Sequence, residues 1–469
     1  GTFSPGFFSS RSARIEANPT LRRYGIAVSD VDLDGDFEAI VAGYSGGSEV
    51  WDYKDGAIVD ITPPALVDGN RKAIGVAACD VSGDGAEEIY FLNIDQFGGL
   101  GEVSDRLWHR GESGWEDLFE RANNAEAINQ FSGRSVACLD RDSDGVYGVF
   151  VANYGGPMKL FELDEDKTLR DRAEEAGVAL VTGGRALVYL PLGGDEMDLF
   201  AGNENGPNFA FENLGDGSFR ERANELGIAD AMQTVRGASV LDADNDGDFD
   251  LVYGNWEGPH RLWLRDESGT FVDKTPAAMR EPSRIRTLIA ADFDNDGFEE
   301  LFWNNIGEAN RLFVQGDEGW VSAPLGDALE PQGHGTGAAV LDIDGDGMLE
   351  LMIAHGEAQS EALTLYVTPP NSNHALRVLA LSEHGAPARG AMVELKGSER
   401  TQVRLIDAGS GYLCQMEPVA HFGLGQDDTL PTLTLTWPGG HTWSGLAPAL
   451  DGTLTVSPSG IKDFRPFLR

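Results

Sequence analysis

Residues 242–250, DADNDGDFD, decide the fold of this chain. Aspartate occupies positions 1, 3 and 5 of the stretch, glycine occupies position 6, and a further aspartate occupies position 9. Glycine permits a tight turn that gathers the carboxylates, and gathered carboxylates are the ligands that a hard divalent cation prefers. Apolar runs flank the stretch at 238–241 and 251–253, and short runs bounded by Gly and Asp are typical of buried strands. We therefore expect a strand, a metal-binding loop and a second strand.

The stretch is one copy of a repeat. Other copies begin at Asp30, Asp80, Asp140, Asp292 and Asp342. Successive copies are 50 residues apart, except for a step of 60 residues after the second copy and of 102 residues after the third. The longest step contains a degenerate copy, since residues 184–203 repeat the pattern of residues 133–153 with a loop one residue shorter. Four short strands in such a unit make a propeller blade, so the predicted fold class is all-β, with a seven-bladed β-propeller over residues 1–369.

Segments rich in Ala, Glu and Arg separate some of the units. They are DLFERANNAEAI (117–128), RDRAEEAGV (170–178) and RERANELGI (220–228). Helix-favouring residues with Gly near the end predict short helices. We place these helices on connections at the rim of the ring, with their charged side chains in solvent.

Each copy of the loop supplies oxygen ligands from the side chains at positions 1, 3, 5 and 9 and from the main-chain carbonyl at position 7. Such a set suits Ca²⁺ above other cations. The loops are not EF-hands, because an EF-hand carries a bidentate Glu at position 12, where these copies carry an apolar or aromatic residue. The four copies with a complete set use Asp30, Asp32, Asp34, Asp36 and Glu38; Asp242, Asp244, Asp246, Asp248 and Asp250; Asp292, Asp294, Asp296, Phe298 and Glu300; and Asp342, Asp344, Asp346, Met348 and Glu350.

Two further copies are incomplete. The second has Ser82 in place of the acid at position 3, and the third has Gly148 at position 9, so we expect weaker sites in both. Their predicted ligands are Asp80, Ser82, Asp84, Ala86 and Glu88 in the second copy and Asp140, Asp142, Asp144 and Val146 in the third. The degenerate fourth copy, PLGGDEMD (191–198), is expected to have lost its ion. The sequence thus predicts five to six structural Ca²⁺ ions.

The charge balance supports bound cations. The chain has 77 Asp and Glu against 35 Lys and Arg, a formal net charge of −42. Plain Asp-rich turns without metal would gather like charges in every loop, whereas bound Ca²⁺ would neutralise part of this excess. This charge balance disfavours nucleic acid and anionic membrane surfaces as partners, because neutralising phosphate needs clustered Lys and Arg.

Cysteine is sparse. Cys79, Cys138 and Cys414 are an odd number, and the first two lie in apolar runs, so buried free thiols are expected; a disulfide between Cys79 and Cys138 is the alternative. The sequence has no run of 18 apolar residues, and it does not open with a basic segment followed by an apolar one. We expect a mature secreted chain without a membrane segment.

The repeat stops near residue 370. Strand-like runs follow at 374–381, 391–397, 401–407, 432–437 and 452–456, joined by turn-rich segments. This pattern predicts a small β-sandwich or barrel over residues 370–460 and a tail at 461–469. His421 and His441 have no His or Cys partner at ligand spacing, so structural roles are expected for both.

These motifs resemble known families. The DxDxDG copies are similar to the FG-GAP and VCBS repeats of integrin α-subunit propellers. GAMVELKG (390–397), IDAGSGYLCQMEPVAHFGLG (406–425) and TWPGG (436–440) resemble the ASPIC and UnbV domain, whose hallmark is an HFGLG turn followed by a WP-G strand. With NENGPNFAFENLGDGSF (203–219) and NWEGPHRLWL (255–264), they make nearly the whole chain similar to the cartilage acidic protein 1 family.

The resemblance implies a secreted protein of the extracellular matrix or nervous system that binds other proteins, with a neuronal member that antagonises the Nogo receptor and so promotes axon growth. A cell-surface receptor or matrix protein is the expected partner, and the chain is expected to be monomeric. Vertebrate members also carry a C-terminal EGF-like domain, and no cysteine-rich segment follows Asp463 here. No receptor-contacting residue is carried over to this sequence.

Two other functions remain open. One is a purely structural calcium-binding matrix protein. The other is a polysaccharide-cleaving enzyme, since some polysaccharide lyases are calcium-bearing propellers; it would need a basic groove of Lys, Arg and Tyr facing an acidic sugar, which the charge balance disfavours. GGSE (46–49), ESGT (267–270) and AGSG (408–411) lie where turns are expected and are not nucleophile elbows, so we expect binding rather than catalysis.

Overall fold

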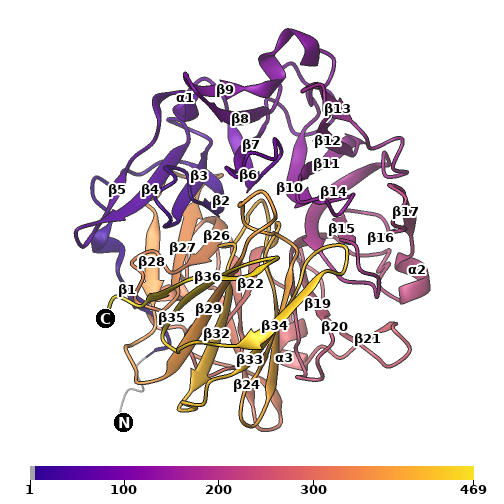
Figure 1. Ribbon diagram of the computed structural model, residues 1–469. Coiled ribbons are helices and arrows are strands. Elements are labelled where there is room, and N and C mark those ends of the chain that lie inside the picture. The colour runs from indigo at the N-terminus through magenta and orange to yellow at the C-terminus, as the bar shows by residue number, and fades with distance from the viewer. Residues whose placement is uncertain (1–5) are drawn as a thin grey trace.

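The computed structural model describes residues 6–469, and nearly all of its regular structure is β-strand. Five four-stranded sheets and one eight-stranded sheet surround a common axis, and the C-terminal strands lie against one end of the ring (Figure 1). The eight-stranded sheet contains two groups of four strands, in residues 133–171 and 181–221, so the ring has seven groups of four. The predicted all-β propeller with a further β unit is therefore confirmed. No helix among the described residues combines the length and apolar character that a bilayer span requires.

The blades follow one another along the chain, and each runs from an inner strand outward. Their strands are β2 (Arg23–Ser29), β3 (Glu38–Gly43), β4 (Glu49–Lys54) and β5 (Ala57–Asp60); β6 (Ala73–Cys79), β7 (Glu88–Asn93), β8 (Arg106–Gly111) and β9 (Gly114–Asp117); β10 (Gly133–Leu139), β11 (Gly148–Pro157), β12 (Lys159–Leu163) and β13 (Leu169–Asp171); β14 (Val181–Tyr189), β15 (Leu199–Asn203), β16 (Phe209–Asn213) and β17 (Phe219–Glu221); β18 (Val235–Leu241), β19 (Asp250–Asn255), β20 (Arg261–Arg265) and β21 (Phe271–Asp273); β22 (Ile285–Ala291), β23 (Glu300–Asn305), β24 (Arg311–Gly316) and β25 (Gly319–Ser322); and β26 (Gly335–Leu341), β27 (Glu350–His355), β28 (Thr364–Val367) and β1 (Ser9–Ser10).

The N-terminal strand closes the ring. β1 pairs with β28, with Ser9 opposite Val367 and Ser10 opposite Tyr366, so the last blade takes its outer strand from the start of the chain. The inner strands contact their neighbours all the way round, including β26 with β2. Closure leaves no inner sheet edge free to pair with another chain.

Every inner strand begins with a register shift against the second strand of its blade. The shifts lie between Arg23 and Ile26, Ala73 and Gly75, Gly133 and Ser135, Gly184 and Ala186, Val235 and Ala238, Ile285 and Leu288, and Gly335 and Gly337. A β-bulge re-aims a side chain out of the normal alternation. We call this end of the ring, where the inner strands begin, the bulge face, and the end where they run into the Asp-rich loops the loop face.

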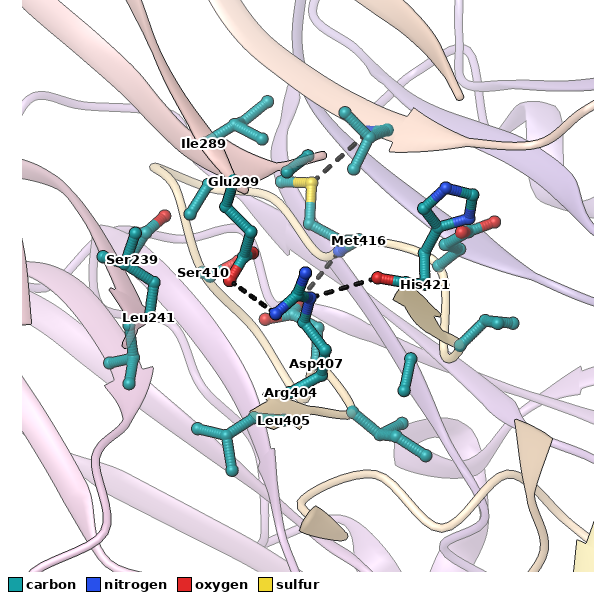
Figure 2. Close-up of a pocket in the computed structure, with 18 of the residues that line it drawn as sticks. Ser239, Leu241, Ile289, Glu299, Arg404, Leu405, Asp407, Ser410, Met416 and His421 are labelled. Carbon is teal, nitrogen blue, oxygen red and sulfur yellow. Dashed lines mark hydrogen bonds and ion pairs between the residues drawn. The ribbon is translucent and has the colours of Figure 1, made fainter. Parts of the chain in front are cut away.

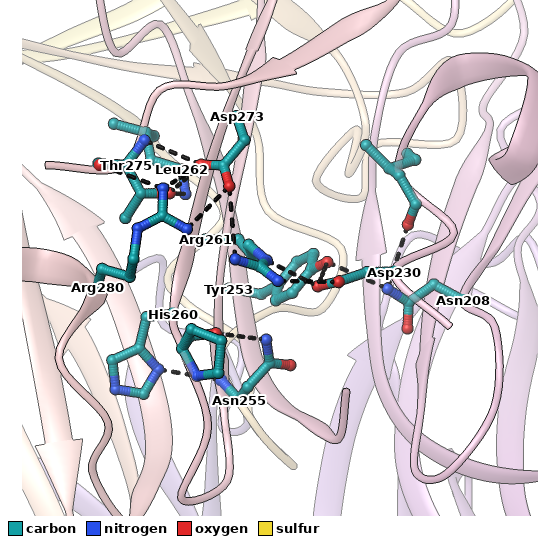
Figure 3. Close-up of polar contacts among 12 residues, drawn as sticks. Asn208, Asp230, Tyr253, Asn255, His260, Arg261, Leu262, Asp273, Thr275 and Arg280 are labelled. Carbon is teal, nitrogen blue, oxygen red and sulfur yellow. Dashed lines mark hydrogen bonds and ion pairs between the residues drawn. The ribbon is translucent and has the colours of Figure 1, made fainter. Parts of the chain in front are cut away.

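A polar side chain at the end of the second strand fixes the next turn. In the fifth blade, Asn255 Nδ2 donates to the Pro259 carbonyl at 2.6 Å and its main-chain N–H donates to His260 Nδ1 at 3.0 Å (Figure 3). Asn203 and Asn305 make the equivalent bonds in the blades on either side. Buried polar groups are thus satisfied by the repeat itself.

Polar contacts also join neighbouring blades. Asp230, which lies between the fourth and fifth blades, accepts hydrogen bonds from the Tyr253 hydroxyl at 2.6 Å and from Arg261 Nε at 3.0 Å (Figure 3). Asn208 of the fourth blade donates to the same hydroxyl at 3.3 Å. These bonds supplement the apolar packing between blades.

The predicted rim helices are shorter than expected. Residues 117–128 contain only two 3₁₀ turns, Leu118–Glu120 and Ala122–Asn124, and within 170–178 only residues 173–177 form a turn. Within 220–228 the four-residue helix α2 (Ala223–Leu226) ends at Gly227, which has a φ of 87°. Two further four-residue helices are α1 (Pro64–Val67) and α3 (Ala277–Arg280). Connections of this length cannot hold longer helices between paired outer strands.

The C-terminal strands form two four-stranded sheets that pack on each other. One has the order β32 (Ala420–Gly425), β29 (His374–Ala380), β35 (Gly452–Ser457), β36 (Gly460–Pro466), and the other has the order β31 (Thr401–Leu405), β30 (Met392–Lys396), β33 (Thr432–Thr436), β34 (Thr442–Leu446). A single apolar cluster that includes Leu376, Phe422, Leu435 and Leu454 joins the two sheets. Residues 461–466 belong to β36 rather than to a separate tail, whereas the predicted division of the chain at residue 370 stays a prediction.

The connection between β31 and β32 enters the centre of the ring. We call residues 406–419 the plug segment. Its main chain bonds to inner strands of several blades: Cys138 N–H donates to Ala408 O at 2.8 Å, Ala238 N–H to Gly411 O at 2.8 Å, and Gln415 N–H to Ile26 O at 2.9 Å. Residues 408–419 are all buried, so the axis of the ring is filled by chain from the C-terminal unit.

The cysteines correct one expectation. Cys79 and Cys138 form a disulfide, with Cα atoms 6.2 Å apart, so the prediction that both are free thiols was wrong and the alternative holds. The two residues are near the ends of β6 and β10, which ring closure places side by side. Cys414 is a buried free cysteine in the plug segment, as predicted.

Candidate metal centres

The six Asp-rich loops share one backbone conformation. The glycine at position 6 has a positive φ in each, between 76° and 93°, at Gly35, Gly85, Gly145, Gly247, Gly297 and Gly347. Its N–H donates to the position 1 carboxylate, for example from Gly35 to Asp30 Oδ2 at 3.0 Å and from Gly247 to Asp242 Oδ2 at 2.9 Å. A side chain is strained at this φ, which explains why the repeat requires glycine there.

The acid at position 9 lies at the start of the second strand, and its carboxylate accepts a hydrogen bond from the main-chain N–H at position 2 of the loop. Glu38 Oε2 accepts the Val31 N–H at 2.7 Å, and Glu300 Oε2 accepts the Phe293 N–H at 2.8 Å. Asp250 and Glu350 make the same bond at 2.8 Å. This bond holds the position 9 carboxylate against the start of the loop, so it faces the acids at positions 1, 3 and 5.

Four loops bring four carboxylates together within 4.8 Å of one another. The clusters are Asp30, Asp32, Asp34 and Glu38; Asp242, Asp244, Asp246 and Asp250; Asp292, Asp294, Asp296 and Glu300; and Asp342, Asp344, Asp346 and Glu350. These are the side chains of the four sets predicted as complete, and they could hold metal ions.

Two buried carboxylate oxygens indicate whether a cation fits these clusters. Glu38 is fully buried and Asp292 is 1% exposed, yet Glu38 Oε1 and Asp292 Oδ1 have no hydrogen-bond partner among the described residues. An unpartnered buried carboxylate oxygen costs free energy unless a cation takes the place of the missing donor. The residues present therefore fit a hard divalent ion.

Burial and mutual repulsion raise the pKa of these carboxyl groups. Desolvation is the largest cause at Glu38, with Asp32 and Asp30 adding to it, and the pKa rises to about 10. Desolvation also raises the pKa of Asp250 to about 8 and that of Asp30 to about 6. The ionised clusters are thus unfavourable without a compensating positive charge.

The second loop recruits a residue that the sequence analysis missed. Its cluster consists of Asp84, Glu88 and His109, and His109 Nδ1 lies 2.8 Å from Glu88 Oε1. That hydrogen bond is the main cause of a raised His109 pKa. Asp80 instead accepts the N–H groups of Gly83 and Gly85, at 2.8 and 3.0 Å. The His109 side chain comes from β8, outside the loop, so no spacing rule could have found it.

The third loop differs from the complete ones at position 9, whereas the fourth has Pro191 and Gly193 in place of the acids at positions 1 and 3. In the third, Gly148 leaves space that the Glu162 side chain approaches, and Glu162 is held by Arg141 at 2.6 and 2.8 Å. In the fourth, the Asp198 carboxylate accepts the N–H groups of Leu192 and Asn213, both at 2.8 Å. The ligand sets predicted for the third loop and the loss predicted for the fourth stay predictions.

The C-terminal unit covers the loop face. It contacts all seven loops, through Arg465 to Asp36 (2.9 Å), Arg389 to Glu87 (2.7 Å), His384 to Asp144 O (3.0 Å), Gly439 N–H to Asp195 O (2.7 Å), Arg400 to Asn245 (2.9 Å), Gly423 N–H to Asp292 Oδ2 (3.0 Å) and Leu468 N–H to Gly345 O (2.8 Å). The loops and the C-terminal unit therefore position each other.

A small cavity of about 100 Å³ lies at this junction (Figure 2). Arg404 crosses it, with its guanidinium 3.4 Å from Glu299 of the propeller and its Nε donating to the His421 carbonyl at 3.1 Å. The His421 ring is itself paired, with Nε2 2.6 Å from Asn295 Oδ1 and Nδ1 3.1 Å from Arg377. The predicted structural role of His421 agrees with these contacts.

Comparison with known proteins gives the family. The family model described as FG-GAP-like repeat matches residues 30–91, 193–253, 242–303 and 292–353, and the model described as ASPIC and UnbV matches residues 382–462. Cartilage acidic protein 1 from Xenopus tropicalis is 45% identical in an alignment 468 positions long that covers 92% of this chain and 72% of the relative. The chain belongs to the cartilage acidic protein 1 family. Cartilage acidic protein 1 from mouse and from human is 44% identical in alignments 464 positions long that cover 91% of this chain and 72% and 70% of those relatives.

All four complete carboxylate clusters lie inside the segments that match the FG-GAP-like repeat. The name cartilage acidic protein agrees with the acidic composition found here and describes no catalytic activity. Among solved structures, BBS1N in complex with ARL6DN matches with a TM-score of 0.49 at 10% identity, over 79% of this chain and 99% of that one. A match at this level carries no information on function.

Proposed function

We propose that this protein is a secreted calcium-binding extracellular protein that acts as a rigid protein-binding module. The four clusters of four carboxylates, two of them with a buried unpartnered oxygen, are the observation that supports calcium. Oxygen-only ligand sets around a glycine turn favour Ca²⁺ over transition metals, which prefer imidazole or thiolate ligands. With the two incomplete loops, we propose five to six bound ions.

Calcium in this role is structural. Bound ions would neutralise the clusters and fix the loop face, on which the C-terminal unit rests. Extracellular calcium sites bind at roughly 0.1 to 1 mM, so at about 1 mM ion each site would add about 0.4 to 1.4 kcal/mol to stability. Several such terms are a large part of the free energy of unfolding of a typical domain.

The expected partner is a cell-surface receptor or a matrix protein. The family resemblance makes the Nogo receptor one candidate. In its most specific form, our proposal is that the protein antagonises this receptor. The C-terminal unit occupies the loop face, so we place the partner-binding surface on the outer strands and connections of the ring. Binding residues are commonly found on loops that a rigid scaffold positions.

Two measurements test the proposal. Native mass spectrometry of the chain with and without a chelator should show five to six Ca²⁺ ions, and fewer than four would contradict the calcium assignment. A pull-down of neuronal or cartilage surface proteins with and without chelator should yield a calcium-dependent receptor. If only the melting temperature responds to calcium and no partner is captured, the protein is a structural matrix component instead.

A further inference from the structure

A second cavity opens at the bulge face, at the other end of the inner strands from the calcium loops. Its volume is about 500 Å³, a size that suits a small ligand. Five arginines line it, Arg22, Arg134, Arg185, Arg236 and Arg286, together with Lys72. In a chain with a net charge of −42, this concentration of positive charge is unexpected.

Four of these arginines, all except Arg22, occupy one position of the repeat. Each stands six residues before position 1 of its loop, in the third to sixth blades, and the same position holds Tyr24, Ile74 and Thr336 in the other blades. This position lies within the β-bulge that begins every inner strand. The bulge therefore turns the same side chain of successive blades toward one place on the axis.

Charge in the cavity is not balanced by the protein. Glu204 pairs with Arg185 and lies 3.7 Å from Arg236, and Glu357 pairs with Arg286 at 2.7 Å, so the four repeat arginines share two carboxylates. The third carboxylate of the lining, Asp95, accepts the Glu102 N–H at 2.8 Å. The hydrogen bonds of Arg134 within the described chain go to the carbonyl oxygens of Gly133 and Phe97. Burying a guanidinium without a counter-charge is costly, so the cavity favours an anion.

Two of the arginines also have an unused donor. Arg236 is 6% exposed and Arg286 is 8% exposed, and Nε of each has no hydrogen-bond partner within the described part of the chain. The planar guanidinium presents donors in a fork that matches the two oxygens of a carboxylate or sulfate.

Aromatic side chains hold the arginines in place. Trp256 lies between two of them, with its ring 5.2 Å from the Arg236 guanidinium and 4.8 Å from that of Arg286. The Tyr154 ring lies 4.7 Å from the guanidinium of Arg185. Stacking of this kind preorganises the donors, which lowers the entropy cost of binding a ligand.

We propose that this cavity is an anion-binding site that takes the carboxylate or sulfate group of a small ligand, of the kind that an acidic sugar presents. Tyr24, Tyr44 and Lys72 complete the groove of Tyr, Lys and Arg that an acidic-sugar ligand requires. The net charge of the chain argued against such a groove, but net charge is a sum over the molecule and says nothing about where charges gather. The site is separate from the calcium loops, so it does not depend on the function proposed above.

The ionisation of Tyr412, which lies in the plug segment, provides a way to detect ligand binding at this site. Its hydroxyl lies 3.3 Å from Arg185 NH1. Burial opposes ionisation of this phenol, but Arg185, Arg286, Arg236 and Arg134 outweigh burial and lower its pKa to about 8. A bound anion would compensate the same arginines and raise that pKa again.

The test uses the full chain, with sodium sulfate, sodium glucuronate and glucose as probes and sodium chloride at matched ionic strength as the salt control. Calorimetry should show binding of sulfate and glucuronate but not of glucose. Arg236→Gln should weaken binding about tenfold or more, because it removes a charged hydrogen-bond donor. Arg220→Gln, which alters an arginine that is 58% exposed on the rim strand β17, should leave binding unchanged.

A second variant and a second readout keep the test decisive if Arg236→Gln does not fold. Arg134→Gln leaves no carboxylate unpaired and should also weaken binding. In the unaltered chain, sulfate should raise the pKa of Tyr412, measured by absorbance at 295 nm and assigned with Tyr412→Phe. Equal binding of sulfate and glucuronate would identify the bare anion as the ligand group, and tighter glucuronate binding would show a contribution from the sugar. Absence of binding by either anion, or equal binding of glucose, would overturn the proposal.

Discussion

The two ends of the inner strands gather side chains of opposite charge, although one repeat encodes both. At the loop face, position 1 of the repeat is aspartate in six blades, and the acids gather in loops that the C-terminal unit covers. At the bulge face, the residue six positions earlier is arginine in four consecutive blades, and the cavity that it lines is open. A covered charge cluster suits a structural ion, whereas an open one suits an exchangeable ligand.

Calcium removal is expected to have the largest effect. A chelator should lower the melting temperature by on the order of 5–10 °C, since several sites each contribute about 0.4 to 1.4 kcal/mol. Differential scanning calorimetry measures this shift. Sulfate binding at the bulge face, measured below the melting temperature, should change little, because the cavity uses no loop carboxylate. An unchanged melting temperature would show that the clusters bind no stabilising ion.

The junction between the C-terminal unit and the loop face can be broken at Arg389. Its fully buried guanidinium pairs with Glu87 at 2.7 and 3.0 Å and donates to the Val28 carbonyl at 2.7 Å. Arg389→Met leaves the buried Glu87 carboxylate without its ion-pair partner. The free energy of unfolding, measured by urea denaturation, should fall by about 3–5 kcal/mol. Arg220→Met is the surface control. Adding Glu87→Leu to Arg389→Met should recover part of the loss, and no recovery would mean that packing rather than charge pairing dominates.

One loop offers a matched pair of substitutions. Asp244→Asn removes a ligand charge at position 3 of the fifth copy and should weaken that site by about tenfold. Asp248→Asn changes another exposed acid, four residues further along the same loop at position 7. Only the main-chain carbonyl is a predicted ligand at this position, so the substitution should not change calcium affinity. Calcium titration of both variants measures the difference, and equal losses would contradict the ligand assignment.

The smallest effect concerns the bulge face and pH. The pKa of Tyr412 is lowered to about 8 in the folded chain and is about 10 in an unfolded one. A phenol with a depressed pKa stabilises the fold fully above its unfolded pKa and loses that contribution as pH falls through its folded pKa. Stability relative to Tyr412→Phe should therefore rise as pH increases from 8 to 10, and a phenol that titrates near pH 10 would contradict the proximity of the four arginines.

Much of the loop face was predictable because it is local. Spacing within nine residues places Asp242, Asp244, Asp246 and Asp250 around one point, and the glycine at position 6 fixes the turn that gathers them. The participation of His109 was not predictable, because it reaches its cluster from another strand of the blade. The same holds for Arg389 and Arg377, which contact the loop face from the C-terminal unit.

The repeat could have shown that arginine recurs at one position, but it could not have shown that these side chains line a common cavity. The alignment of the copies shows Arg134, Arg185, Arg236 and Arg286 in register. Only the β-bulge decides that these side chains point to the axis and not into a blade. The free-thiol prediction for Cys79 and Cys138 failed for a related reason, since their proximity depends on the packing of neighbouring blades.

The sequence by itself determined the repeat, the carboxylate clusters of the loops, the all-β class and the family, because each depends on residues close together along the chain. The tertiary structure alone decided that β1 closes the ring, that the plug segment fills its axis, that the C-terminal unit covers the acidic loops and that four arginines meet in one cavity. These contacts join residues up to several hundred positions apart, and they form only when ring closure brings the blades around one axis.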